Sequence, residues 1–253
     1  MRKEEIKQVV REGYAKIAKQ TSSCCTPVNS CCGSTDLAQD ISKSIGYTEE
    51  ELTSVPEGAN LGLGCGNPVA LASLREGETV LDLGSGAGFD CFLAANRVGR
   101  TGKVIGVDMT PEMLEKAREN ARKGNYTNVD FRLGEIENLP VADNSVDVII
   151  SNCVINLSSD KAQVFKEAYR VLRPGGRVMV SDIVLLKELP DAIKGSVAAY
   201  TGCIAGASRK EDYLATVASA AFQDVEVISE VSLGTGELAG LAASVIVRAI
   251  KPD

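Results

Sequence analysis

The chain has 253 residues, of which 34 are acidic and 27 are basic, and its formal net charge is −7. Because no block of Lys or Arg could neutralise a phosphate backbone, we do not expect a nucleic acid as a partner. The length allows a full hydrophobic core, and we expect one domain with a smaller appendage.

The N-terminal residues 1–20 are predicted to form an amphipathic helix that packs on another element. Apolar side chains recur there at helical spacing between charged ones: Ile6, Val9, Val10, Gly13, Tyr14 and Ile17. The segment lacks the continuous apolar core of a secretory signal, and the most apolar stretch, residues 238–250, is too short to span a bilayer as a helix. We therefore expect a soluble, cytoplasmic protein with no membrane partner.

Residues 21–36 contain four of the eight cysteines, in two adjacent pairs. The pairs lie among Ser, Thr, Pro, Asn and Gly, a composition typical of a loop. Structural disulfides are rare in a reducing cytosol, so we expect reactive or ligating thiols. The sequence has no His, so neither an imidazole base nor an imidazole ligand is available.

From Thr79 onwards, strand and helix patterns alternate. Strands are expected at residues 79–84, 103–108, 128–134, 145–152 and 175–182, and helices at 88–98, 111–123 and 159–172. Short apolar runs between longer helices favour a parallel sheet covered on both faces. Further helices are expected near 190–202 and 209–220, and the last two strands, 224–233 and 242–250, are expected to form an antiparallel edge of the same sheet.

Residues 82–88, DLGSGAG, form a glycine-rich loop between a predicted strand and a predicted helix. Gly84 and Gly86, on either side of Ser85, let the backbone approach a ligand beside a helix N-terminus. A dinucleotide fingerprint would need glycine where Phe89 stands. The observed G-x-G-x-G after an acidic residue resembles the S-adenosylmethionine loop of class I methyltransferases, so it favours adenosylmethionine over NAD.

Polar residues near the strand ends complete the predicted cofactor site. Asp82 precedes the glycines, and Asp108 closes the next strand, where its carboxylate can accept both ribose hydroxyls. The alternative for Asp108 is a cap of the following helix. Glu135 and Ile136 match the class I stretch that holds adenine, although Glu135 could instead be a solvated turn residue. The predicted set also includes Met109 and Asn152.

Cys153 directly follows the strand at 145–152. In an open parallel sheet, ligands bind beyond the carboxyl ends of the strands, near the point where the strand order reverses. Cys153 should therefore face that crevice, and the alternative is a thiol packed in the core. Cys91, inside the helix after the glycine loop, is expected to pack in the core.

Three phrases resemble the motifs of arsenite S-adenosylmethionine methyltransferases: ANLGLGCGNP with Cys65, SNCVINLSSDK with Cys153, and YTGCIAGA with Cys203. The resemblance runs from about Ile41 to the C-terminus. It implies an α/β fold with the class I, Rossmann-like methyltransferase sheet.

The resemblance also implies three parts of the chain. Residues 1–70 would form an N-terminal helix and a thiol-bearing loop, and residues 71–183 would bind S-adenosylmethionine. Residues 184–253 would form a small C-terminal α+β region that binds arsenic and completes the sheet.

In this family Cys65, Cys153 and Cys203 would bind trivalent arsenic as substrate, either arsenite or methylarsenite. Thiolates are suitable ligands for such a soft centre. The arsenic lone pair carries no proton, so the methyl transfer that detoxifies arsenite needs no imidazole base. Tyr14 would lie in the N-terminal segment that folds over the cofactor, or it would pack within its own helix.

Each transfer would leave pentavalent arsenic, which enzyme thiols would reduce before thioredoxin or glutathione reopened the resulting disulfide. Among the four N-terminal cysteines, position favours Cys32 and then Cys31 as the redox thiol. A zinc site built from these cysteines is disfavoured, because adjacent pairs depart from the usual C-x2-4-C spacing.

Two other functions stay open. A methyltransferase of another small metabolite would carry incidental cysteines, so Cys153→Ser would leave most of its activity. A thiol-based arsenic sensor would bind adenosylmethionine weakly or not at all.

Overall fold

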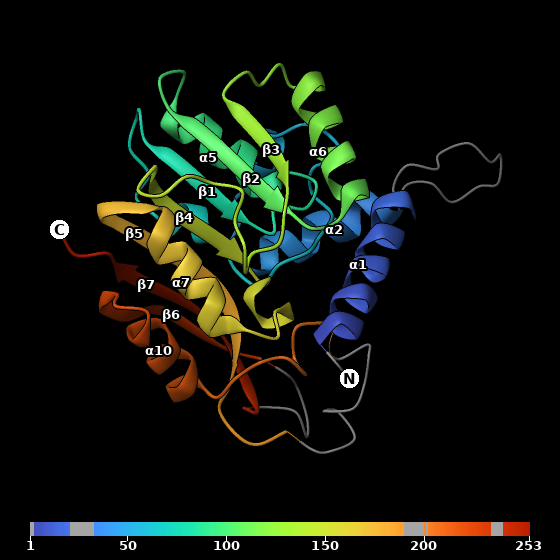
Figure 1. Ribbon diagram of the computed structural model, residues 1–253. Helices are drawn as coiled ribbons and strands as arrows, with labels where there is room; N and C mark the ends of the chain where they lie inside the picture. Colours follow the sequence, from blue (N-terminus) through green and yellow to red (C-terminus); the bar gives the residue numbers. More distant parts are fainter. Residues whose placement is uncertain (1–2, 21–32, 190–199, 201, 234–239) are drawn as a thin grey trace.

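The computed structural model describes residues 3–189, 200, 202–233 and 240–253, apart from residues 21–32 (Figure 1). The four N-terminal cysteines, including Cys32, lie outside these described residues, and so does most of the helix expected near residues 190–202.

The described residues form a seven-stranded sheet with the order β3-β2-β1-β4-β5-β7-β6. The strands are β1 Thr79–Leu83, β2 Lys103–Asp108, β3 Val129–Leu133, β4 Val146–Asn152, β5 Leu172–Leu185, β6 Gln223–Leu233 and β7 Ala242–Ile250. Strands β1 to β5 are parallel, β7 is antiparallel to β5, and β6 is antiparallel to β7. The predicted α/β class and the antiparallel C-terminal edge are therefore confirmed.

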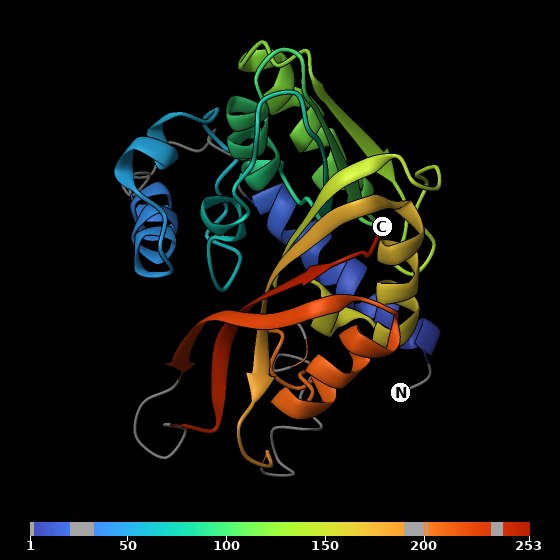
Figure 2. The ribbon, with the colours of Figure 1, turned by 90° about the vertical axis from the view of Figure 1, so that its left-hand side faces the viewer.

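Helices cover both faces of the sheet (Figures 1 and 2). They are α1 Lys3–Gln20, α2 Gly33–Ser44, α3 Glu49–Thr53, α4 Pro68–Leu71, α5 Phe89–Val98, α6 Pro111–Lys123, η1 Ile155–Leu157, α7 Lys161–Val171 and α10 Lys210–Ser219. Successive strand residues point to opposite faces. In β1, Val80 packs in the cluster that contains Phe92 of α5, while Leu81 packs in the cluster that contains Phe165 of α7.

The sheet has its switch point between β1 and β4, because β2 and β3 lie on one side of β1 while β4 and β5 lie on the other. The carboxyl ends of β1, β2 and β4 meet at this edge, and the glycine loop leads from β1 into α5. Ligand sites of open α/β sheets lie at such a point.

The N-terminal helix α1 packs beside α6, as Figure 1 shows, and Lys19 Nζ lies 2.9 Å from Glu112 Oε1. The sequence predicts that this helix packs on another element, and its contact with α6 confirms this. The expected loop at 21–36 is too long, because α2 begins at Gly33. Gly, Ser, Thr and Asp in this stretch indicate a loop by composition, but such residues are also favoured where helices begin.

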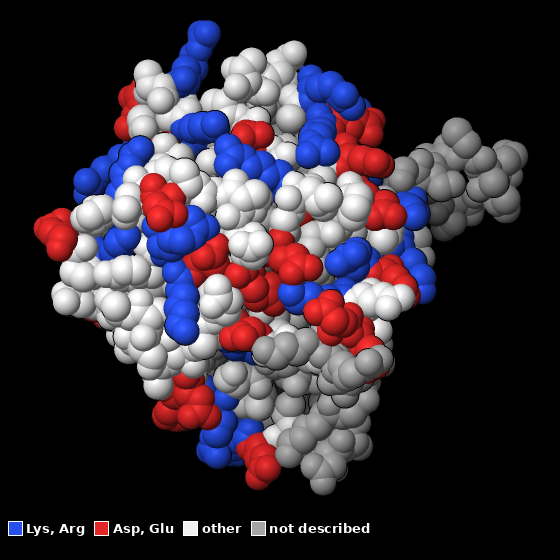
Figure 3. Space-filling model, in the orientation of Figure 1, with Lys and Arg blue, Asp and Glu red and all other residues white. Residues whose placement is uncertain are grey.

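No helix within the described ranges is long and apolar enough to cross a membrane. On the described part of the face drawn in Figure 3, Lys and Arg side chains are interspersed with Asp and Glu.

Candidate active site

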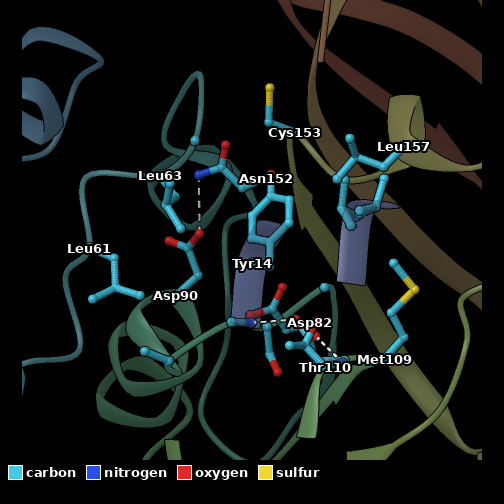
Figure 4. A pocket seen from close by; sticks show the side chains of 18 of the residues that line it. Tyr14, Leu61, Leu63, Asp82, Asp90, Met109, Thr110, Asn152, Cys153 and Leu157 are labelled. Atoms are coloured by element: carbon cyan, nitrogen blue, oxygen red, sulfur yellow. Dashed lines mark hydrogen bonds between the residues drawn. The ribbon is translucent and has the colours of Figure 1, made fainter. Parts of the chain in front are cut away.

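A cavity of about 320 Å³ lies at the carboxyl ends of β1, β2 and β4 (Figure 4). Its walls come from α1, the loop at residues 59–64, the glycine loop, the ends of β2 and β4, and the segment around Cys203. Eight of the nine predicted cofactor residues line it: Asp82, Gly84, Ser85, Gly86, Asp108, Met109, Ile136 and Asn152. The thiol-bearing residues Cys153 and Cys203 line it as well.

The geometry of the glycine loop lets a ligand approach the backbone closely. Gly84 has φ +70°, and a Cβ added there would lie 2.4 Å from Val154 Cγ2. Gly86 has φ +52° and faces open space, with no heavy atom within 4 Å of a built Cβ. Ser85 Oγ is buried and has no hydrogen-bond partner among the described residues. An open glycine face beside an unpaired hydroxyl fits a ligand that brings its own polar atoms.

Asp108 joins the end of β2 to the glycine loop. Its Oδ2 accepts from the Gly86 amide at 2.9 Å and its Oδ1 accepts from the Thr110 amide at 2.8 Å. Burial raises the pKa of Asp108, and these amide donors oppose that rise. The N-cap residue of α6 is Thr110, so Asp108 does not take the alternative role of capping this helix.

Glu135 does not line the cavity. Its carboxylate pairs with Lys7 of α1 and lies 3.9 Å from Arg11. Glu137, which the sequence analysis did not single out, lines the cavity instead and accepts from Ser158 Oγ at 2.6 Å. The structure therefore places Ile136 at the cavity and turns Glu135 towards α1.

Asn152, at the end of β4, connects the cavity to the loop that carries Cys65. Its Oδ1 accepts from the Cys65 amide at 2.9 Å, and its Nδ2 donates to the Gly66 carbonyl at 2.8 Å. A Cβ added at Gly64 would lie 2.8 Å from Asn152 Nδ2, so a glycine is needed at this contact. The motif ANLGLGCGNP is thereby fixed to the switch point of the sheet.

Asp90 and Tyr47, neither of which the sequence predicts as a site residue, extend this network. Tyr47 OH donates to Asp90 Oδ1 at 2.6 Å, and Asn152 Nδ2 donates to Tyr47 OH at 2.9 Å. Asn152 Nδ2 also donates to Asp90 Oδ2 at 3.2 Å, as Figure 4 shows. Burial raises the pKa of Asp90 to about 6, while the hydrogen bonds from Tyr47 and Asn152 oppose the rise. No local motif signals this contact, because the residues come from three distant segments.

Asp82 is also buried, and desolvation, followed by the charge of Asp90, raises its pKa well above the usual range. The thiol of Cys91 donates to Asp82 Oδ2 at 3.2 Å. Cys91 is fully buried in the core, as expected, and it also gives Asp82 a weak donor.

The segments that carry Cys65, Cys153 and Cys203 converge beside the cavity. Cys203 Sγ donates to the Cys153 carbonyl at 2.8 Å, and Cys65 Sγ lies 3.5 Å from Ser181 Oγ. The neighbouring thiols of Cys203 and Cys65, followed by burial, raise the pKa of Cys153 well above the usual range. Within the described ranges, no group of three or more Cys, His, Asp or Glu side chains is already arranged to hold a metal ion. The three thiols are therefore neighbours that do not yet form a closed ligand set.

Helix α1 covers these thiols. Tyr14 lines the cavity, and Figure 4 shows its ring between Asn152 and Asp82. Burial raises the pKa of Tyr14, and the thiols of Cys203 and Cys153 add to this rise. Tyr14 therefore faces the cavity instead of packing only within its own helix.

The fold and cavity define a class I methyltransferase. A family model described as a methyltransferase domain matches residues 74–221. A solved structure, an arsenic(III) S-adenosylmethionine methyltransferase from Chlamydomonas reinhardtii, has 33% identity and a TM-score of 0.67, and the match covers 84% of this chain and 73% of that one. The chain belongs to the arsenite S-adenosylmethionine methyltransferase family.

Curated relatives named arsenite methyltransferase agree with this assignment. The relative from Halobacterium salinarum is 54% identical over 231 residues, which are 88% of this chain and 59% of the relative. The human relative is 36% identical over 217 residues, which are 82% of this chain and 55% of the relative. The chain therefore spans less than two thirds of the length of these relatives.

Proposed function

We propose that this protein methylates arsenite, with S-adenosylmethionine as the methyl donor and arsenic held by Cys65, Cys153 and Cys203. The observation that carries the proposal is the convergence of these three thiol-bearing segments at the wall of a cavity that begins at a class I glycine loop. A methyltransferase of another small metabolite would need none of these thiols in that place.

The cavity supplies suitable contacts for the cofactor. The open face of Gly86 and the unpaired hydroxyl of Ser85 would accept close approach by the methionine part, and Asp108 would accept the ribose hydroxyls. Ile136 would cover adenine. When bound, adenosylmethionine supplies an electrophilic methyl group on a sulfonium sulfur.

Binding of arsenite needs no prior ionisation of the thiols. Each As–S bond forms as an As–O bond breaks, and the thiol proton leaves with the departing hydroxide as water. A Cys153 thiol with a raised pKa stays protonated at neutral pH and can provide that proton. The thiols then orient the arsenic lone pair, and such positioning contributes roughly 7–11 kcal/mol to well-arranged reactions.

The reductive half of the cycle is proposed from the family resemblance. Methyl transfer leaves arsenic pentavalent, and two thiols that oxidise to one disulfide return two electrons to it. Methylarsenite would then be the next substrate. Cys32 and its neighbours are the candidates, with thioredoxin or glutathione as the external reductant in a cytoplasmic setting.

The test is a reaction of the full chain with methyl-labelled adenosylmethionine, arsenite and reduced glutathione, followed by arsenic speciation. We expect methylated arsenic from the wild type and about a hundredfold less from Cys153→Ser, because serine is a poor ligand for a soft centre. Arsenite affinity is measured in parallel by calorimetry without the cofactor, and there Cys91→Ala, which removes a buried thiol outside the converging set, is the matched control and should bind arsenite normally.

Two results would contradict the proposal. Adenosylmethionine binding without any methylated arsenic would support a methyltransferase of another small metabolite. Tight arsenite binding without adenosylmethionine binding would support a thiol-based sensor.

A further inference from the structure

The walls of the cavity carry more acidic than basic side chains. Four of its lining residues are acidic, namely Asp82, Asp90, Asp108 and Glu137, and one is basic, Lys7. Lys7 is paired with Glu135 and lies 3.6 Å from Glu137. Within the described part of the chain, no Lys or Arg forms an ion pair with any of the three aspartates, and the hydrogen bonds to them come from neutral groups.

These neutral partners differ in kind. Asp108 is held by two backbone amides that also shape the glycine loop. Asp90 is held by two side chains from other segments, the phenol of Tyr47 and the amide of Asn152. Asp90 is 8% exposed and still lines the cavity. Its carboxylate is therefore fixed in position without being neutralised.

Buried charge without a partner is costly, and a cation brought by a ligand removes that cost. Burial raises the pKa of each of the three aspartates, which is the response expected when no cation lies near. The buried, unpartnered hydroxyl of Ser85 in the same wall is a second sign that a ligand completes the site. The arrangement suits a ligand with a fixed positive charge.

We propose that Asp90, held by Tyr47 and Asn152, is a specificity-determining residue that makes the cavity prefer the cationic sulfonium of adenosylmethionine over the neutral thioether of its product, adenosylhomocysteine. The inference rests on the proposed function and deepens it. The sulfonium loses its charge when the methyl group leaves, so the same carboxylate favours the reactant and promotes release of the product. Charge, more than shape, distinguishes the two ligands.

The test compares the dissociation constants of adenosylmethionine and adenosylhomocysteine by calorimetry at neutral pH, with no arsenic present. In Asp90→Asn we expect adenosylmethionine to bind about tenfold more weakly, while adenosylhomocysteine changes less than about twofold. Asp90→Glu, which keeps the charge, should retain most of the preference. Asp130→Asn, at a carboxylate outside the cavity that pairs with Arg132, is the matched control and should change neither constant.

Equal weakening of both ligands in Asp90→Asn would overturn the inference, because it would assign Asp90 a role in the scaffold alone. If the wild type bound neither ligand, the proposed function would fail instead. If Asp90→Asn did not fold, the ratio of the two constants in the wild type would be followed from about pH 7 to about pH 5. The preference should fall as Asp90 is protonated near pH 6, and a constant ratio would overturn the inference.

Three titratable groups from other elements face Asp90 and bear on that pH series. Tyr47 lies against it from the N-terminal segment, Asp82 from β1 and Glu51 from α3. The charge of Glu51 adds to the raised pKa of Asp90, and the hydrogen bond from Tyr47 opposes it. Burial, followed by the charge of Asp90, raises the pKa of Asp82 as well.

Discussion

The Cys203 thiol donates a hydrogen bond of 2.8 Å to the backbone carbonyl of Cys153, so one candidate arsenic ligand holds the backbone that presents another. Both residues have left-handed backbone angles, with φ of 64° and 60°. Such angles are uncommon for residues other than glycine and persist where surrounding contacts determine them. The hydrogen bond and the packing around it keep both thiols beside the cavity.

Cys203 has two proposed roles, as a hydrogen-bond donor to the Cys153 carbonyl and as an arsenic ligand. Its replacement by serine and by alanine distinguishes the two roles. Serine can still donate to the Cys153 carbonyl, so Cys203→Ser should retain nearly the wild-type free energy of unfolding. Cys203→Ala should lose about 1 kcal/mol. Both variants should lose arsenite affinity alike, by calorimetry. If Cys203→Ser bound arsenite normally, Cys203 would not be a ligand.

Lys161 at the start of α7 is predicted to position the Cys203 segment. Its Nζ donates to the Gly206 carbonyl at 2.7 Å. Lys161→Met should weaken arsenite binding about tenfold, because the loop that carries Cys203 loses this tether, while adenosylmethionine binding should change little. X-ray absorption of bound arsenic should show fewer sulfur neighbours. Lys166→Met, at an exposed position of the same helix, is the control and should bind arsenite normally.

Gly206 packs directly on the segment that follows Cys153. A Cβ added at Gly206 would lie 2.1 Å from the backbone oxygen of Asn156, which cannot rotate away as a side chain can. Gly206→Ala should therefore displace the Cys203 segment, cost roughly 1–3 kcal/mol of stability and reduce arsenite affinity. Gly77→Ala has a strained φ of +85° but ordinary contacts, so it should lower the melting temperature without changing arsenite affinity. Equal arsenite affinities in the two variants would contradict the prediction.

Asp182 is predicted to make stability depend on pH. It is fully buried, and desolvation raises its pKa to about 7, with the charge of Lys161 opposing the rise. In the unfolded chain its pKa is about 3.9. The folded state therefore binds the proton more tightly, so this contribution to stability is present below about pH 4 and is lost as pH rises through about 7. Tyr213 OH donates to Asp182 Oδ2 at 3.2 Å. This hydrogen bond lowers the pKa of Asp182, but the effect of burial is larger, so the pKa stays raised in the folded protein.

Asp182→Asn should remove that dependence. The free energy of unfolding is measured by urea titration from about pH 4 to about pH 8. Its decrease over this range should be roughly 2–4 kcal/mol smaller in the variant than in the wild type. Parallel curves would show that Asp182 keeps an ordinary pKa in the folded protein.

The sheet was predictable because its signals are local. Pro111, a residue favoured at the first position of a helix, begins α6 where the sequence predicts, and the helix ends at the predicted Lys123. The convergence of Cys65, Cys153 and Cys203 followed from the motif resemblance and, for Cys153, from the rule for strand ends.

The polar network around Asp90 was not predictable in this way. Tyr47, Asp90 and Asn152 come from a loop, a helix and a strand, and no spacing in the sequence marks their contact. Glu135 was expected to contact adenine because it matches a family position, but α1 provides Lys7 as its partner. Contacts between segments distant in sequence are decided by tertiary packing, which local patterns do not contain.

The last strand of the sheet also reaches the first of the three thiol segments. Ser244 of β7 donates to the carbonyl of Cys65, and β7 lies between β5 and β6. During synthesis, Cys65 and Cys153 leave the ribosome well before Ser244 does. A nascent chain therefore gains the backbone support for Cys65 only when β7 enters the sheet, so the three thiol-bearing segments reach their final arrangement only in the finished fold.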